Sequence, residues 1–330
     1  MFLRFRNITY SLALVLGMIP LKGIAQICNI SVPATMVDAT TGKFIPTIQP
    51  AMLHARINKD FLPVSEVERI RNFRVLLLLD GSGSMSVEGG AVLNKKETVQ
   101  HIKEILDENL DHLPDGVQVA FGIFNKQVVF GNEFTSDPDR LHHIIPETIA
   151  RLKSAGRGTT ALLDAIHQGL AQFTPVRPGD TIVLLTDGED NVSTHISEKE
   201  LARELSRKGV RLFVLWVKDQ SPAAFPWAAA TATALSEFAE RSGGTVYTYG
   251  VRNSAMLHDS KRTQLDQNDL NRFWNEEILS AYQIRFSLPS GTKNDQKWLL
   301  AVDPVANGGN KMAADYPSRL EPCPVSTAVR

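Results

Sequence analysis

The sequence predicts an α/β fold in which a doubly wound, mostly parallel sheet is flanked by helices, with short β-rich segments at both ends of the chain. Between residues 72 and 250, apolar strand-like runs alternate with amphipathic helical stretches. Three of these runs are almost continuously apolar, which is typical of strands buried on both faces of a parallel sheet. Glycines end two of the helical stretches, at Gly209 and at Gly243-Gly244.

The individual elements of this region follow from the same two patterns. Strands are expected over the apolar runs Arg74–Leu79, Val117–Phe124, Gln127–Phe130, Thr181–Leu185, Arg211–Val217 and Thr245–Tyr249. Helices are expected where apolar side chains recur every three or four residues, over Leu93–Leu110, Pro138–Leu152, Ala161–Phe173, Glu198–Lys208 and Pro226–Arg241. Trp216, in the fifth strand, is expected to pack in the core.

The segments on either side of this region have a different pattern. Residues 26–70 contain short extended pieces separated by turn residues, which predicts a short β segment. Residues 251–302 are expected to form a polar linker over 251–269, followed by a helix and two strands at Leu270–Leu279, Ala281–Leu288 and Gln296–Val302. The proline-rich end of the chain, residues 303–330, is expected to be an irregular tail.

The first 25 residues have the layout of a secretory signal peptide. Arg4 and Arg6 precede an apolar stretch from Tyr10 to Leu21, and small residues at positions 23 and 25 favour cleavage after Ala25. The apolar stretch is short for a membrane span, although an uncleaved anchor is the alternative. The mature protein is therefore expected to be periplasmic or secreted, with no membrane span after cleavage.

The net charge limits the classes of partner that the chain could bind, and the cysteine content limits the disulfide bonds that it could form. Removing the leader leaves 32 basic and 36 acidic side chains, a net charge of −4, which argues against a nucleic-acid binder held by bulk charge. The chain's two cysteines, Cys28 and Cys323, lie near the two ends of the mature protein. In an oxidising compartment they could form one disulfide that closes the chain, and two separate free thiols are the alternative.

Oxygen-bearing side chains follow the predicted strands at three places. Asp80, Ser82 and Ser84 alternate after the first strand, and Asp187 follows a later one. The loop before the helix at 161 adds a hydroxyl from Thr160 or its neighbour Thr159. Ligands of open α/β sheets bind at the carboxyl ends of the strands. Two carboxylates and three hydroxyls predict a hard-cation site that is left open for water or an outside oxygen.

Competing interpretations of these residues are weaker. The glycines after Asp80 lack the third glycine of a dinucleotide-binding turn, no phosphate-binding P-loop motif occurs, and the nucleophile-elbow pattern around Ser82 is broken. Glu189 and Asp190 are expected to form a solvated helix entry rather than to bind metal. Nothing in the spacing places His195 as a catalytic base.

The pattern Asp80-x-Ser82-x-Ser84, with Thr160 and Asp187 downstream, resembles the metal-ion-dependent adhesion site (MIDAS) of von Willebrand factor type A (vWA) domains, which have a Rossmann-like fold. The blocks Val119–Phe124, Gly158–Ile166 and Val183–Asn191 extend the resemblance over residues 72–250. The chain looks most similar to bacterial exported proteins with such a domain. The resemblance implies that Asp80, Ser82, Ser84, Thr160 and Asp187 bind Mg²⁺, or else Ca²⁺ or Mn²⁺. It also implies a protein partner that presents an Asp or Glu to the metal.

The function predicted from these observations is metal-dependent protein binding, with no enzymatic activity, because no side chain is placed by its spacing as a general base. Two alternatives remain open at this point. One is a metal-assisted hydrolase that uses the same cation to activate water. The other is a structural component of the cell envelope with an empty site.

Overall fold

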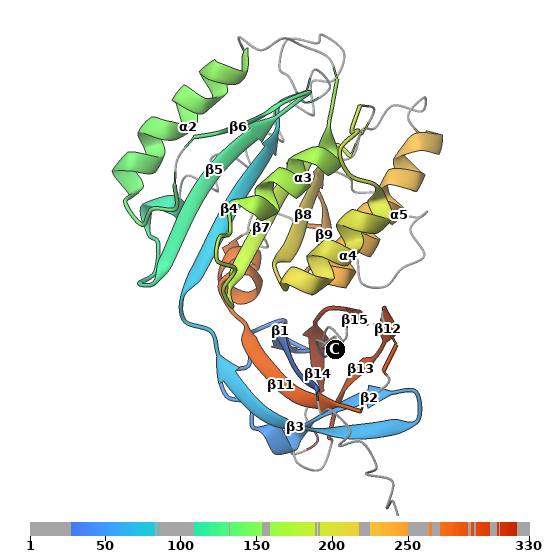
Figure 1. Ribbon diagram of the computed structural model, residues 1–330. Coiled ribbons are helices and arrows are strands. Elements are labelled where there is room, and N and C mark those ends of the chain that lie inside the picture. Colours follow the sequence, from blue (N-terminus) through green and yellow to red (C-terminus); the bar gives the residue numbers. More distant parts are fainter. Residues whose placement is uncertain are drawn as a thin grey trace, which may run out of the picture.

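The computed structural model consists of an α/β domain and a smaller β domain, which are stacked end to end (Figure 1). The residues that it describes are 28–82, 85, 109–131, 133–153, 159–188, 190, 192–217, 225–249, 264–265, 271–289, 292–293, 295–303, 309 and 311–321. The predicted signal peptide, residues 1–25, lies outside these ranges. No helix among the described residues is long and apolar enough to cross a membrane.

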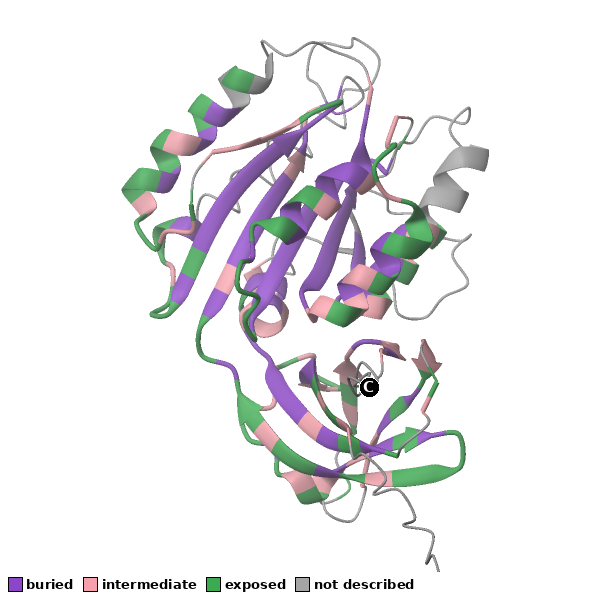
Figure 2. Cartoon of the chain, in the orientation of Figure 1, coloured by how far each residue is buried: buried purple, intermediate pink, exposed green. Residues whose placement is uncertain are grey.

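A seven-stranded sheet forms the centre of the α/β domain. Its strands lie in the order β10-β9-β8-β7-β4-β5-β6, and every neighbouring pair is parallel except β5 and β6. The strands are β4 (Phe73–Asp80), β5 (Val117–Phe124), β6 (Val128–Phe130), β7 (Asp180–Thr186), β8 (Arg211–Val217), β9 (Val246–Tyr249) and β10 (Gln264–Leu265). All residues of β7 and β8 are buried, as Figure 2 shows. The predicted mostly parallel sheet is therefore confirmed.

Helices cover this sheet on both faces, which confirms the doubly wound arrangement. They are α2 (Pro138–Lys153), α3 (Leu162–Ala171), α4 (Glu198–Lys208) and α5 (Phe225–Ser242). One apolar cluster joins α2 to one face through Leu141 and Ile145, and a second joins α3, α4 and α5 to the other. Of the helix expected over 93–110, only residues 109 and 110 are described, and both are helical.

Local sequence signals explain where α4 begins and ends. The Ser197 hydroxyl accepts a hydrogen bond from the Glu200 backbone N–H, and the Glu200 side chain accepts one from the Ser197 backbone N–H. This reciprocal pair satisfies backbone donors that the first helical turn leaves unpaired. The helix ends at Gly209, which adopts a left-handed conformation with φ 67°.

The β domain combines the two ends of the described chain in one antiparallel sheet. Its order is β13-β2-β3-β11-β1-β14, so strands from both ends of the sequence lie next to one another. The strands are β1 (Cys28–Asp38), β2 (Leu53–Ile57), β3 (Asp60–Arg69), β11 (Tyr282–Leu288), β13 (Leu299–Val302) and β14 (Met312–Asp315), with a short helix η1 (Pro50–Met52) before β2. The α/β domain is thus inserted into the sequence of the β domain.

Two parts of this domain differ from the sequence expectations. The region expected to be an irregular tail contains β14 and a further strand, β15 (Arg319–Leu320), which pairs with β12 (Gln296–Lys297). β14 forms because a partner far away in the sequence, β1, supplies its hydrogen bonds. The long strand β3 was not expected, because most of its residues are exposed, half of them are polar and it contains Pro63.

The two domains meet at the amino ends of the parallel strands. The segment expected to be a helix over Leu270–Leu279 contains a π-helix, η3 (Phe273–Ile278), whose Phe273 and Trp274 pack against the α/β core. Arg211, at the start of β8, is fully buried and donates hydrogen bonds to the Thr35 hydroxyl of β1 and to the Ile278 carbonyl. The expected linker 251–269 lies outside the described residues except for β10.

Candidate metal centre

Asp80 is the last residue of β4 and is almost completely buried. The Gly81 N–H bonds to the Phe124 carbonyl at the end of β5, at 2.7 Å, and so extends the pairing of β4 with β5 by one residue. The Ser82 backbone N–H then donates to Asp80 Oδ1 at 2.9 Å, and Ser82 is also buried. Ser84, the third predicted ligand of this turn, lies outside the described residues.

The end of β7 brings the second carboxylate to the same edge of the sheet. β7 lies next to β4, and Asp187 directly follows its last residue, Thr186. The Thr186 hydroxyl donates to Asp80 Oδ2 at 2.6 Å and accepts from the Gly188 N–H at 3.0 Å. Gly188 has φ 90°, a conformation that favours glycine, so the turn after Asp187 depends on this residue type.

Two residues that support this edge were not predicted as part of the site. Thr186 holds one oxygen of Asp80, and the Trp216 Nε1–H donates to the Asp187 carbonyl at 2.8 Å. Trp216 is buried, as expected, but it also fixes the turn that carries a candidate ligand. The hydroxyl directly before Asp187 at a strand end was a usable signal for Thr186. The role of Trp216 depends on a neighbouring strand and has no local signal.

The third loop contributes Thr160, which is buried, whereas the neighbouring Thr159 is half-buried. The Thr160 carbonyl accepts a hydrogen bond from the Val192 N–H, in the loop that follows Asp187, at 3.3 Å. The next residue, Ala161, donates its N–H to the Asn125 carbonyl, just after β5, at 2.8 Å. These bonds tie the loop before α3 to the loops that follow β5 and β7. The choice of Thr160 over Thr159 as the ligand stays a prediction.

The electrostatics of this edge favour a cation. Burial, followed by the nearby charge of Asp187, raises the pKa of Asp80 to about 7, although hydrogen bonds from Thr186 and Ser82 act in the opposite direction. Two carboxylates held together away from water are costly unless a positive charge compensates them. Among the described residues no group of three or more His, Cys, Asp or Glu side chains could hold a metal. The candidate donors at this edge are two carboxylates and nearby hydroxyl oxygens, a combination that suits a hard divalent cation.

Polar residues near this edge have structural partners. Asp190 Oδ1 accepts hydrogen bonds from the backbone N–H groups of Leu162, at 3.2 Å, and Ser193, at 3.3 Å, so it supports the start of α3 as a helix-entry residue. Glu189 lies outside the described residues.

His195 is largely exposed and pairs with the buried Asp164 on α3, its Nδ1 lying 2.8 Å from Asp164 Oδ2. Burial would raise the pKa of Asp164, but hydrogen bonds from His195 and Thr194 outweigh it and lower that pKa. This pair holds the loop after β7 against α3, since the backbone N–H groups of Thr194 and His195 also donate to Asp164. The described contacts therefore give His195 a structural role.

Comparison with known protein families identifies the α/β domain. The von Willebrand factor type A domain family matches residues 75–263, more than half of the chain. The chain belongs to the von Willebrand factor type A family. vWA domains generally act as protein-interaction modules, and the fold described above, a mostly parallel sheet with helices on both faces, is the vWA fold. No curated protein sequence matches this chain.

Several solved structures are similar to this vWA chain at low sequence identity. BatB from Bacteroides thetaiotaomicron is 17% identical with a TM-score of 0.44, covering 62% of this chain and 97% of its own. A von Willebrand factor type A protein from Catenulispora acidiphila is 13% identical with a TM-score of 0.44, covering 91% of this chain and 74% of its own. Manganese-loaded TRAP protein from Plasmodium vivax is 14% identical with a TM-score of 0.40, covering 78% and 98% respectively.

Proposed function

We propose that this chain is an exported protein whose vWA domain binds a divalent cation at a MIDAS and uses it to bind an acidic side chain of a partner protein. The ligands would be Asp80, Ser82, Ser84, Thr160 and Asp187, with Mg²⁺ the expected ion and Ca²⁺ or Mn²⁺ as alternatives. The observation that supports this most is the placement of two buried carboxylates at the ends of adjacent parallel strands, β4 and β7.

The chain's own groups hold the candidate ligands in place before any ion binds. The Ser82 N–H fixes one oxygen of Asp80 and the Thr186 hydroxyl fixes the other, at 2.9 and 2.6 Å. The Trp216 indole fixes the main chain at Asp187. Because these donors leave little freedom to the turns, the entropy lost on binding an ion is small. A bound divalent cation would be nearly neutralised by two carboxylates but coordinatively unsaturated, so that a carboxylate from a partner could complete its coordination.

Export and the cysteine pair complete the proposal. The predicted leader over residues 1–25 would direct the mature chain to the periplasm or out of the cell, where a disulfide between Cys28 and Cys323 would be stable. Cys28 is the first residue of β1 and faces Leu288 of β11 in the sheet register, whereas Cys323 lies outside the described residues. Mass spectrometry of the protein from the extracellular or periplasmic fraction, without reducing agent, tests both the cleavage site and the bridge.

The test of metal-dependent binding compares Asp187→Ala with a control, Asp190→Asn, that changes an exposed carboxylate three residues away. Calorimetric titration with Mg²⁺, Mn²⁺ and Ca²⁺ is expected to show binding to the wild type and the control but not to Asp187→Ala. Capture of partners from envelope extracts should follow the same order and should be lost in excess EDTA. Equal capture with and without EDTA would refute the metal-dependent mechanism, and the circular dichroism of each variant checks that it is folded.

A further inference from the structure

One part of the outer face of the six-stranded sheet is apolar. In the register of the strands, Arg56 of β2 lies between Leu299 of β13 and Phe61 of β3. Side chains alternate between the two faces of a strand, and the neighbouring residues Ala55 and Leu300 are buried in the core of the β domain. The residues on the opposite, outer face of these three strands form what we call the outer patch: His54, Arg56, Phe61, Pro63, Leu299 and Ala301.

Two large apolar side chains of the outer patch are exposed. Phe61 has 61% and Leu299 has 41% of its surface exposed, and Val176 is the one other exposed large apolar side chain among the described residues. Neighbouring strands are about 4.8 Å apart, so Phe61 and Leu299 lie about 10 Å from each other with Arg56 between them. The Phe61 ring also packs edge to face on His54, at 6.4 Å between ring centroids. Single exposed apolar side chains are common, whereas contiguous apolar patches mark interaction sites.

Polar side chains elsewhere on the same sheet face have partners within the sheet. Arg285 of β11 forms ion pairs with Glu66 and Glu68 of β3, at 2.5 and 3.5 Å. The Ser287 hydroxyl donates to the Asn29 side chain of β1 at 2.9 Å. In this half of the face, the sheet itself supplies the partners of its polar side chains.

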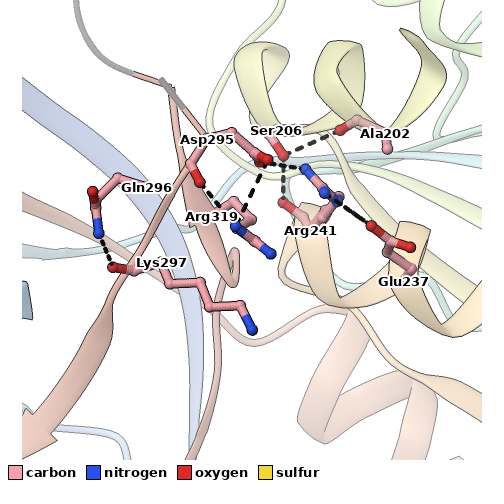
Figure 3. A network of polar contacts seen from close by, with 8 residues as sticks. All are labelled: Ala202, Ser206, Glu237, Arg241, Asp295, Gln296, Lys297 and Arg319. Atoms are coloured by element: carbon pink, nitrogen blue, oxygen red, sulfur yellow. Dashed lines mark hydrogen bonds and ion pairs between the residues drawn. The ribbon is translucent and has the colours of Figure 1, made fainter. Parts of the chain in front are cut away.

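Arg56 differs from the paired arginines of the molecule. Arg319 pairs with Asp295, whose carboxylate also binds Arg241 of α5 at 2.5 Å (Figure 3). No described residue forms an ion pair or a hydrogen bond with the Arg56 side chain, which is exposed. A carboxylate on a neighbouring strand could pair with such an arginine, but its cross-strand neighbours are the two exposed apolar side chains. The outer patch therefore combines an unpaired positive charge with apolar surface.

The chemistry of the outer patch selects the kind of partner. A carboxylate can form two parallel hydrogen bonds with a guanidinium group. Apolar side chains that cover Phe61 and Leu299 would keep water away from that pair and so strengthen its attraction. Arginine and aromatic side chains are also enriched among the residues that contribute most to protein–protein binding. A partner with a carboxylate among apolar side chains therefore complements both properties of the patch.

Two other occupants fit the outer patch less well. A symmetric dimer would place the same patch of both copies face to face, and this would bring two Arg56 guanidinium groups together without a carboxylate. Recognition of an anionic membrane surface takes about four to eight basic side chains, whereas the patch contains a single arginine.

We propose that the outer patch binds a partner protein that presents an Asp or Glu flanked by apolar side chains. The carboxylate pairs with Arg56, and the apolar side chains cover Phe61 and Leu299. β2 and β3 lie on the side of the β domain that faces away from the α/β domain (Figure 1). This site is therefore separate from the candidate metal centre, needs no cation, and goes beyond the function proposed for that centre.

The experiment uses the full mature chain in excess EDTA, so that no divalent cation contributes. A display library of random twelve-residue segments is selected on the wild type, after removal of the segments that bind Arg56→Glu. We expect the retained segments to contain an Asp or Glu between apolar residues. If no segment distinguishes the two proteins, or if the retained segments lack a carboxylate, the proposal is wrong.

Fluorescence anisotropy then measures the binding of a labelled copy of the strongest segment. Arg56→Gln and Phe61→Ser should each weaken it at least about tenfold. Arg203→Gln, which removes an exposed arginine from α4, is the matched control and should change it less than about twofold. A copy with lysine in place of the acidic residue should bind Arg56→Glu more tightly than it binds the wild type. Equal binding of the original segment to the wild type and to Phe61→Ser would overturn the proposal. All the substituted side chains are exposed, and circular dichroism checks that each variant is folded.

Two further measurements separate the proposed partner from the other occupants. Analytical ultracentrifugation should show a monomer, and a dimer that Phe61→Ser dissociates would mean that the outer patch binds a second copy instead. Vesicles of phosphatidylglycerol should not bind the chain, and binding that Phe61→Ser abolishes would mean that the patch recognises a membrane. Segment binding should persist in Asp187→Ala, so a failure of this proposal is distinguishable from a failure of the metal proposal.

Discussion

At the carboxyl ends of β4 and β7, Asp80 lies near a second carboxylate, Asp187. At the start of β8, by contrast, Arg211 lies close enough to Glu277 for the two charges to attract one another. Burial is the main reason that the pKa of Asp80 and that of Glu277 both rise to about 7. The two ends of one sheet therefore each contain a carboxyl group in a place that disfavours its charged form, and they differ in what surrounds it.

At the domain junction the chain supplies its own cation and hydrogen-bond partners. Arg211 donates to Thr35, Thr181 and the carbonyls of Glu277 and Ile278, and its guanidinium lies 5.2 Å from the centre of the Phe213 ring. The Tyr247 hydroxyl donates to the Glu277 carboxylate. At the other end the largest influences on Asp80 are burial and another carboxyl group. The comparison shows that, at the domain junction, the protein's own Arg211 supplies the positive charge, while the end that holds Asp80 is suited to an external cation.

The largest expected effect is the loss of Arg211. Arg211→Met leaves the Thr35 and Thr181 hydroxyls and two carbonyls without this donor inside a buried interface. We expect the free energy of unfolding to fall by about 3–5 kcal/mol. Urea unfolding measures it, with Arg203→Met, an exposed arginine on α4, as a control expected to change stability by less than about 0.5 kcal/mol. A loss below about 1 kcal/mol would show that the junction does not depend on this cation.

A smaller effect should follow from Glu277 and should depend on pH. Because its folded pKa of about 7 lies above the ordinary value of 4.5, the folded protein retains a proton that the unfolded chain releases. Its contribution to stability is therefore present below about pH 4.5 and is lost as pH rises to about 7. We expect Glu277→Gln to remove this loss. The unfolding free energy of the variant, relative to that of the wild type, should therefore rise by about 1–3 kcal/mol when the pH is raised from 5 to 8.

Urea unfolding of both proteins at the two pH values tests this expectation. The titration of Asp80 is common to both proteins, so the difference between them isolates Glu277. An equal difference in unfolding free energy at pH 5 and pH 8 would contradict the assignment, since it would mean that Glu277 binds the same number of protons in the folded and in the unfolded protein throughout this range.

The smallest effect, and one of opposite sign to that of Arg211, is expected at the metal end. In excess EDTA at pH 8, Asp187→Asn removes one of two buried like charges, so the unfolding free energy should rise by about 1–2 kcal/mol. The same variant should show no thermal stabilisation by Mn²⁺, whereas the wild type and Asp190→Asn should be stabilised. Destabilisation of the metal-free protein by Asp187→Asn would show that the chain's own groups already stabilise the Asp187 carboxylate without a metal ion.

The sequence predicted the α/β domain because its signals are local. Strands such as β7 and β8 are apolar throughout, and α4 carries its own start and stop residues, so both could be found without knowledge of their neighbours. The same holds for Asp80 and Asp187, which the ends of two parallel strands bring to one edge. Their order along the chain was enough to place them together.

What could not be predicted depends on contacts between distant parts of the chain. β14 has no strong strand pattern of its own and forms by pairing with β1, more than 270 residues earlier. The hydrogen bond from Thr186 to Asp80 joins residues 106 positions apart, and that from Trp216 to the Asp187 carbonyl joins adjacent strands. The cleft of about 500 Å³ between α5 and the β domain has no local signal either, because its lining residues come from both domains.

The insertion of the vWA domain into the β domain has a mechanical consequence. The chain enters the α/β domain between β3 and β4 and returns through β11, and the Ile70 N–H bonds to the Ala281 carbonyl at 2.9 Å where the two connections pass. β3 and β11 then continue side by side as an antiparallel pair. A pull exerted by a partner on the metal end and resisted by the β domain would divide between two connections, and separating the domains would require both to yield.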